Sequence, residues 1–190
     1  EFEQMEIEYF VPPYMEEECP YLDEQLLALE LNVFPIAQQR TNGNAMSMKL
    51  KECIAKGYLR PWHGYWIALM YRWFLDLGVD PSKLRIRQHL PNERSHYARD
   101  TWDIEYHFPF GWKEITGIAD RGTYDLTQHA KFSGADLSYF DEEKKERLVP
   151  FVIEPSQGVD RAFLVFLMDA WHEEEERVIL RLDPRLAPYK

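Results

Sequence analysis

The sequence predicts an α+β domain in which helices flank an antiparallel sheet. Three observations lead to this fold class. Segments with the two-residue hydrophobic period of strands lie far apart in the chain, two of them form a hairpin, and two long apolar helices can cover a sheet. With 190 residues, 45% of them hydrophobic, the chain has enough apolar material for one sizeable core.

The first element is a strand over residues 3–11. Apolar side chains at Met5, Ile7 and Tyr9 alternate with polar ones, which is the pattern of a half-buried strand. We therefore expect these three side chains to pack under the sheet, and Pro12 to end the strand.

A less regular block follows. Helical propensity favours short helices over residues 22–31 and 46–56, and Gly57 would end the second helix. The polar stretch between them interrupts the hydrophobic pattern. The block from about residue 25 to residue 61 is therefore interpreted as an insertion.

The strongest helix covers residues 62–77, where large apolar side chains follow the three-and-four spacing of one buried face. The remaining elements are a strand at 84–89, a hairpin of 101–108 with 112–119, a loop and edge strand at 131–139, a strand at 149–154 and a helix at 159–171. Gly158 directly precedes this last helix.

The formal charge of −11 excludes a surface that is basic overall, as many nucleic-acid-binding domains have. One segment is locally basic and is a candidate patch for phosphate groups. Its cations are Lys83, Arg85, Arg87, Arg94 and Arg99. Cys19 and Cys53 lack the spacing of a zinc site, so we expect two reduced thiols.

No apolar run approaches the roughly 20 residues of a membrane-spanning helix, and residues 1–8 are too acidic for a secretion signal. We therefore expect a soluble, cytoplasmic domain that makes no membrane contact. Because the chain opens with Glu1 inside an apparent strand, we also expect a partial sequence.

Three strand carboxylates are candidates for chemistry: Glu6, Glu114 and Glu154. Carboxylates gathered in one pocket suit a cation, either a substrate ammonium or Mg²⁺, although the pattern equally fits solvent-facing strand residues. Arg161, one turn into the helix after Gly158, could form an anion site with that helix's N-terminus or be an ordinary exposed arginine. Neither a nucleophile elbow nor a glycine-rich phosphate loop is present, which disfavours covalent hydrolases and P-loop enzymes.

Three ordered segments carry a specific resemblance. They are EFEQMEIEYF (residues 1–10), HYARDTWDIEYHFPFGWKEITGIADRGTYDLTQH (96–129) and VPFVIEPSQGVDR (149–161). These segments resemble the catalytic domain of the dimeric class II glycyl-tRNA synthetases, the first being similar to the end of class II motif 2 and the last to motif 3. The likeness covers residues 1–14 and 62–189, whereas the block 25–61 has no clear counterpart.

The resemblance implies a site, residue by residue. The implied glycine-binding residues are Phe2, Glu3, Gln4, Met5, Glu6, Glu154, Pro155, Ser156, Gln157 and Gly158. The implied ATP-binding residues are Phe2, Glu114, Ile115, Gly158, Val159, Asp160 and Arg161. Phe2 would stack on adenine, Glu6 would bind the ammonium, and Arg161 and Glu114 would be catalytic, with Glu114 also facing Mg²⁺.

The resemblance further implies a class II synthetase-like antiparallel sheet and a glycine–tRNA ligase that uses ATP and Mg²⁺, acts on glycine and tRNA(Gly), and works as a homodimer. Residues 1–182 would be part of the catalytic domain, and 183–190 would begin a linker to an anticodon-binding domain. The family's motif 1 and motif 2 arginine lie outside the chain, so we expect this chain alone to be almost inactive. The alternative is an accessory or binding module that keeps the fold without aminoacylation activity.

Overall fold

The structure is a computed structural model that describes residues 3–189. Its helices are α1 (Glu24–Leu27), α2 (Ile36–Arg40), α3 (Leu50–Ala55), α4 (Pro61–Asp76), α5 (Tyr124–Ser133) and α6 (Val159–Ala170), with short 3-10 turns at Pro13–Met15 and Pro81–Lys83. Its strands are β1 (Gln4–Glu6), β2 (Tyr9–Val11), β3 (Glu30–Phe34), β4 (Met46–Lys49), β5 (Leu84–Gln88), β6 (Asp100–Phe108), β7 (Gly111–Gly122), β8 (Tyr139–Asp141), β9 (Glu146–Leu148), β10 (Phe151–Gly158), β11 (Trp171–Glu173) and β12 (Val178–Leu180).

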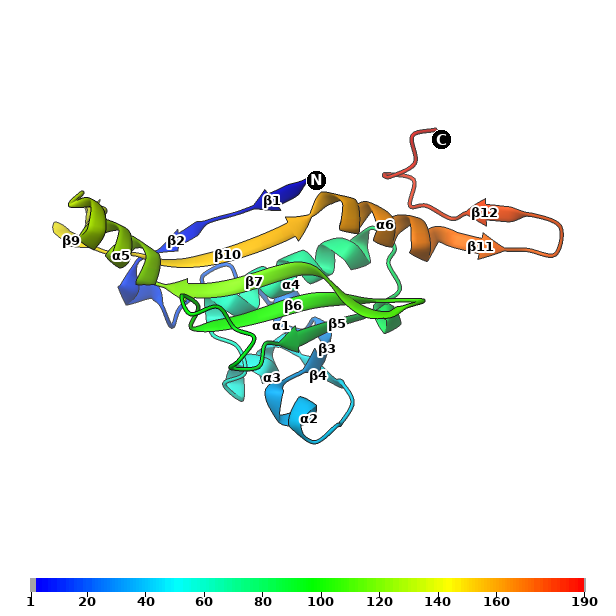
Figure 1. The fold of residues 1–190 in the computed structure, drawn as a ribbon, viewed down its shortest axis with the longest axis horizontal. Coiled ribbons are helices and arrows are strands. Elements are labelled where there is room, and N and C mark those ends of the chain that lie inside the picture. The colour runs from blue at the N-terminus through cyan, green and yellow to red at the C-terminus, as the bar shows by residue number, and fades with distance from the viewer. Residues whose placement is uncertain (1–2, 190) are drawn as a thin grey trace.

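One long sheet organises the molecule. Its order is β1-β10-β7-β6-β5-β3-β4, with β2 also paired to β10, and every pair is antiparallel except β3 with β5. Figure 1 shows α5 and β9 at one end of β10, and α6 leading into the β11–β12 hairpin at the other. The expected α+β class with a largely antiparallel sheet is confirmed, as are the hairpin of β6 with β7 and the strands at β5 and β10.

Helix α4 covers one face of the sheet, as its hydrophobic spacing predicts. Trp66, Ile67 and Phe74 on its inner side are buried, and the helix packs against β6, β7 and β10. On the facing strands, Ile104 and Ile118 are fully buried. Burying one such large side chain contributes roughly 1.5 to 3 kcal/mol, so this layer supplies much of the stability.

The prediction for residues 22–31 and 46–56 was wrong in part. Only Glu24–Leu27 is helical in the first segment, because Glu30–Phe34 forms β3 and buries Leu31 and Val33 in the core. In the second, Met46–Lys49 is strand β4, which pairs with β3 before α3 begins. Pairing and burial outweigh local helix propensity here.

Two other expectations need correction at strand boundaries. The run 3–11 forms two short strands on β10, and Met5 and Ile7 are 52% and 41% exposed instead of packing under the sheet. Residues Lys131–Ser133 complete α5, which ends at Gly134 with φ of 71°, so the edge strand begins only at Tyr139. A left-handed residue at this position is a common helix end.

Candidate active site

The strand register gathers polar residues on the sheet face opposite to α4. Directly paired residues of antiparallel strands project to the same side. The register pairs Glu6 with Ser156, Ser156 with Gly117 and Gly117 with Asp103, so these four share a face. Glu154, two residues from Ser156 on β10, also projects to it. This polar face holds the expected carboxylates Glu6 and Glu154 together.

Glu114 lies on the same face but farther along β7. It pairs with Glu105 beyond a register shift, and five residues separate it from Ala119, the partner of Glu154. Its carboxylate reaches back along the strand, because Oε1 lies 3.5 Å from the point where a Cβ on Gly117 would stand, and Gly117 pairs with Ser156. The Glu114 carboxylate therefore lies close to the Ser156 position, on the face that also holds Glu6 and Glu154.

Arg161 accompanies Glu114. Its Nη1 donates a hydrogen bond of 3.0 Å to the backbone oxygen of Glu114 and lies 3.7 Å from the carboxylate Oε2. Both side chains are about half exposed, and they line a groove of about 370 Å³ together with Phe108, Phe110 and Leu164. Burial raises the pKa of Glu114, Asp103 adds to the rise, and Arg161 opposes it.

The N-terminal strand is tied to β10 and to the start of α6. The Gln4 amide donates to Glu6 Oε1 at 2.8 Å and also to the Ser156 hydroxyl. The backbone N–H of Glu3 donates to Asp160 Oδ2 at 3.1 Å, and that of Val159 donates to the Glu3 carbonyl at 2.9 Å. The residues expected around glycine and at the α6 N-terminus are thus neighbours.

Not every expected contact residue turns its side chain to the polar face. Ile115, Pro155 and Gln157 are buried, and Gln157 accepts a hydrogen bond from Thr116 on the α4 side. Met5 pairs with Gln157 and so projects to that side as well. These four residues can meet a ligand on the polar face only through their backbone. Phe2 lies outside the described residues.

Arg121 is a residue that the sequence did not single out for the site. Its guanidinium donates to the Glu154 carboxylate and to Asp125 Oδ2 at 2.5 Å, and lies 4.3 Å from the centre of the Tyr97 ring. Burial raises the pKa of Glu154, Arg121 opposes this, and the nearby charge of Glu6 raises it further. The period of two along β7 does not locate it, because the register shift between Val152 and Ile153 leaves Arg121 as the extra residue of the strand.

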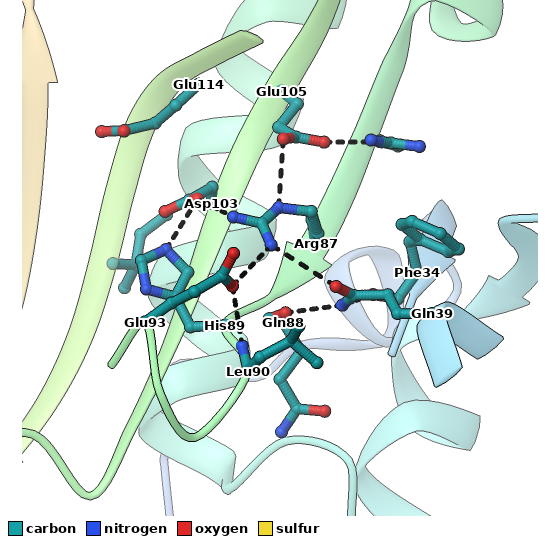
Figure 2. Close-up of polar contacts among 12 residues, drawn as sticks. Phe34, Gln39, Arg87, Gln88, His89, Leu90, Glu93, Asp103, Glu105 and Glu114 are labelled. Atoms are coloured by element: carbon teal, nitrogen blue, oxygen red, sulfur yellow. Dashed lines mark hydrogen bonds and ion pairs between the residues drawn. The ribbon is translucent and has the colours of Figure 1, made fainter. Parts of the chain in front are cut away.

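A second cluster occupies the same face on β5 and β6. Figure 2 shows Arg87 between Glu93, Asp103 and Glu105, with Glu114 beside the cluster. His89 Nε2 lies 2.7 Å from Asp103, and this hydrogen bond raises the pKa of His89. The cluster joins β5, β6 and the loop that holds His89 and Glu93 through charged hydrogen bonds.

These contacts correct the expected phosphate patch. Most of the cations of the basic segment are paired: Lys83 with Asp169, Arg85 and Arg87 with Glu105, and Arg99 with Asp120. Among residues 3–189, only Arg94 of this set forms no ion pair. The segment is therefore mainly structural. The sequence does not reveal these ion pairs, because the acidic partners on β6 and β7 are distant from the cations in sequence.

Across the described part of the chain, no group of three or more acidic, histidine or cysteine residues is arranged to hold a metal ion. Mg²⁺ beside a nucleotide needs only one or two carboxylates, since phosphates and water supply the other ligands. Glu114, half exposed next to Arg161, fits that donor set. Cys19 and Cys53 are free thiols, and no described helix is long and apolar enough to cross a membrane.

The chain matches curated proteins along its whole length. A glycine–tRNA ligase of Thermobifida fusca is 41% identical over 202 residues, covering 100% of this chain and 34% of the relative. Glycine–tRNA ligases of Corynebacterium efficiens and Geobacillus kaustophilus are 47% and 46% identical over 75% of this chain, covering 34% and 32% of their own lengths. The chain is related to the glycine–tRNA ligases.

The resemblance to glycyl-tRNA synthetases is thereby confirmed, and the chain spans about a third of the length of the curated relatives it matches. No family model matches. Among solved structures, seryl-tRNA synthetase from Pyrococcus horikoshii complexed with ATP is similar with a TM-score of 0.47 and 16% identity, over 58% of this chain and 24% of that one.

Proposed function

We propose that the protein carrying this chain is a glycine–tRNA ligase, which activates glycine with ATP and transfers it to tRNA(Gly). The observation that carries the proposal is the pair Glu6 and Glu154 on one polar sheet face, in a chain related to glycine–tRNA ligases. Two carboxylates on one face suit a ligand that is recognised mainly through its ammonium group.

Glycine would bind between Glu6, Glu154 and Ser156. The Gln4 amide already holds both Glu6 and Ser156, so these groups are oriented before the ligand arrives. The proposal requires close walls around these groups, which would leave little room for a side chain on the substrate. Rejection of one extra methyl group contributes about 1 to 3 kcal/mol, which favours glycine over alanine.

ATP would lie toward the other end of β7. Arg161 would meet its phosphates, Phe2 its adenine, and the backbone around Gly158 and Asp160 the remaining groups. Mg²⁺ held by Glu114 would neutralise phosphate charge. Adenylate formation would then be an in-line attack of a glycine carboxylate oxygen on the α-phosphorus, which breaks the α–β phosphoanhydride bond and releases pyrophosphate. This chain would contribute positioning and the charge of Arg161.

The remaining partners follow from the same proposal. They are tRNA(Gly) as acceptor, a second copy of the protein in a homodimer, and the cytoplasm as the compartment. Because the chain spans about a third of the length of the relatives, we expect residues from elsewhere in the protein to complete the site.

The test is glycine-dependent exchange between ATP and pyrophosphate by the natural protein that carries this chain. Arg161→Ala should lower the rate about 10²- to 10³-fold, the usual effect of removing one preorganised charge donor. Arg147→Ala is the matched control, because Arg147 is similarly exposed but lies on β9 and pairs with Asp136.

Equal losses for both variants, or equal exchange with alanine and glycine, would contradict the proposal. Absence of exchange together with retained tRNA binding would favour the accessory-module alternative. An isolated preparation of residues 1–190 should show almost no exchange, and robust activity there would show that the essential residues are misplaced.

A further inference from the structure

Asp103, on β6, uses its two carboxylate oxygens differently. The residue is only 3% exposed, and its Oδ2 accepts hydrogen bonds from His89 Nε2 at 2.7 Å and from Arg87 Nη2 at 3.4 Å. Its Oδ1 accepts no hydrogen bond from any residue among 3–189. Polar atoms of buried residues normally have a hydrogen-bond partner, so the free oxygen of Asp103 needs an explanation.

The free oxygen faces a bare position on the neighbouring strand. Asp103 pairs with Gly117 on β7, and a Cβ on Gly117 would stand 3.7 Å from Asp103 Oδ1 and 3.5 Å from Glu114 Oε1. Apart from Gly117 and its chain neighbours, no other atom of the described chain lies within 4 Å of that point. The two carboxylate oxygens therefore flank a space that only the absence of a side chain leaves open. The other oxygen of Glu114, Oε2, faces Arg161 at 3.7 Å.

Two carboxylates that face one space favour a cation there. Burial is the main cause of the raised pKa of Glu114, and the negative charge of Asp103 adds to the rise. A cation near both groups would relieve this repulsion. Mg²⁺ suits the space, because it binds through one or two carboxylates and keeps several of its water molecules, which donate hydrogen bonds.

Glu105 differs from Asp103 in this respect. It lies two residues farther along β6, projects to the same face and pairs directly with Glu114. Both of its oxygens are bound by arginines, since Oε2 accepts from Arg85 Nε at 2.6 Å and Oε1 from Arg87 Nε at 3.1 Å. Each oxygen of Glu105 thus already has a cationic partner, whereas Oδ1 of Asp103 has none among residues 3–189.

We propose that Asp103 is a positioning residue for the Mg²⁺ expected at Glu114, and that its free oxygen accepts hydrogen bonds from water molecules of that ion in the space over Gly117. The inference rests on the proposed function, which requires a Mg²⁺-bound nucleotide. His89 and Arg87 hold the other oxygen, so Asp103 is oriented before the ion arrives (Figure 2). Groups that support the ligands of a metal ion in this way typically change its affinity about 10- to 100-fold.

The main test measures nucleotide binding by the natural protein with and without Mg²⁺. The ligand is an ATP analogue with a methylene bridge between its α- and β-phosphates, which cannot release pyrophosphate, and calorimetry gives its affinity in Mg²⁺ or in EDTA. Asp103→Asn should weaken binding in Mg²⁺ about 10- to 100-fold and leave binding in EDTA within about twofold. Glu105→Gln is the matched control on the same strand. It loses the pairing with two arginines but should leave both affinities within about twofold.

Gly117→Ala is a second variant, which changes no charge. Its Cβ would meet Asp103 and Glu114 at ordinary contact distances, so the fold should be retained and urea unfolding should show wild-type stability or slightly more. The methyl group nevertheless occupies the space proposed for the water molecules. Binding of the analogue should again weaken in Mg²⁺ and not in EDTA.

Three results would overturn the inference. They are equal weakening of Asp103→Asn in Mg²⁺ and in EDTA, which would indicate a merely structural role, unchanged affinity in Mg²⁺ for Asp103→Asn or Gly117→Ala, and a wild-type affinity that does not depend on Mg²⁺. A wild type that binds the analogue with the expected Mg²⁺ dependence but shows no glycine-dependent exchange would instead refute the proposed function alone. Absence of any binding would refute both.

Discussion

Replacing Arg121 with Gln should destabilise the protein in a pH-dependent way. Arg121 and Glu154 form an ion pair with side chains only 19% and 13% exposed, and Arg121 is also hydrogen-bonded to Asp125. Removing one partner of a buried pair costs about 3 to 5 kcal/mol because the other charge is left uncompensated. With the residual exposure of this pair, we expect about 2 to 3 kcal/mol at pH 7.

The direction of this pH dependence follows from the pKa of Glu154. Its pKa in the folded protein is already raised by burial, and Arg121 opposes the rise. Without Arg121 the pKa rises further, and each additional pKa unit corresponds to about 1.4 kcal/mol. A carboxyl with a raised folded pKa contributes stability fully present below its unfolded pKa, and this contribution is lost as the pH rises through the folded value. The loss in Arg121→Gln should therefore be larger at pH 7 than at pH 4.

The assay is urea unfolding followed by tryptophan fluorescence at both pH values. The double variant Arg121→Gln/Glu154→Gln removes both charges, so its free energy of unfolding should differ from that of wild type by nearly the same amount at pH 4 and pH 7. Asp125→Asn controls for the second partner. If the single variant loses equal stability at both pH values, or if Glu154→Gln does not reduce the pH dependence, the charge argument is refuted.

Two other outcomes are expected. Leu31→Ala should lower the free energy of unfolding by about 2 to 5 kcal/mol in urea titrations, because Leu31 is 1% exposed in the core. Glu30→Ala, on the same strand, is the control and should change the free energy of unfolding little. A loss below about 1 kcal/mol for Leu31→Ala would show that the 25–61 block packs independently. Asp103→Asn should lower the pKa of His89 measured by NMR, and it should destabilise the protein more at pH 5.5 than at pH 8.5. A histidine whose pKa is raised by folding stabilises the folded protein below its unfolded-state pKa, and this stabilisation is lost as the pH rises through the folded-state pKa. An unchanged His89 titration in Asp103→Asn would contradict the assigned hydrogen bond.

The sequence predicts those parts of the fold in which a hydrophobic pattern continues over many residues or in which the pairing partner is close in sequence. Helix α4 has four turns of consistent apolar spacing, and the β6–β7 hairpin closes over a few residues, so both were predicted correctly. The segment around β3 was not, since its strand state depends on a parallel partner about fifty residues away. Local propensity holds no information about such a partner.

The site shows the same division. Period-two patterning puts Ser156 and Glu154 on one face of their strand, and the pairing of β1 with β10 adds Glu6, which only the resemblance had placed beside them. The partners of Arg87 and Arg121 could not be predicted, because each ion pair crosses strands whose register only the folded sheet defines. A run of cations in the sequence therefore looked like a surface patch, although its charges are mostly neutralised.

Charge is distributed unevenly across the polar face, and this locates the demand for a cation. On the β5–β6 side, the arginines at 85 and 87 serve Asp103 and Glu105. On the β1–β10 side, and among residues 3–189, Arg121 is the one cation paired with Glu154, and it also pairs with Asp125. Within the same residues, Glu6 accepts a hydrogen bond only from the Gln4 amide. Burial is the main cause of the raised pKa of Glu154, and the negative charge of Glu6 adds to the rise. A bound ammonium would compensate the negative charge of Glu6 and Glu154, which supports the proposal that glycine binds on this side and the phosphates at the Arg161 end.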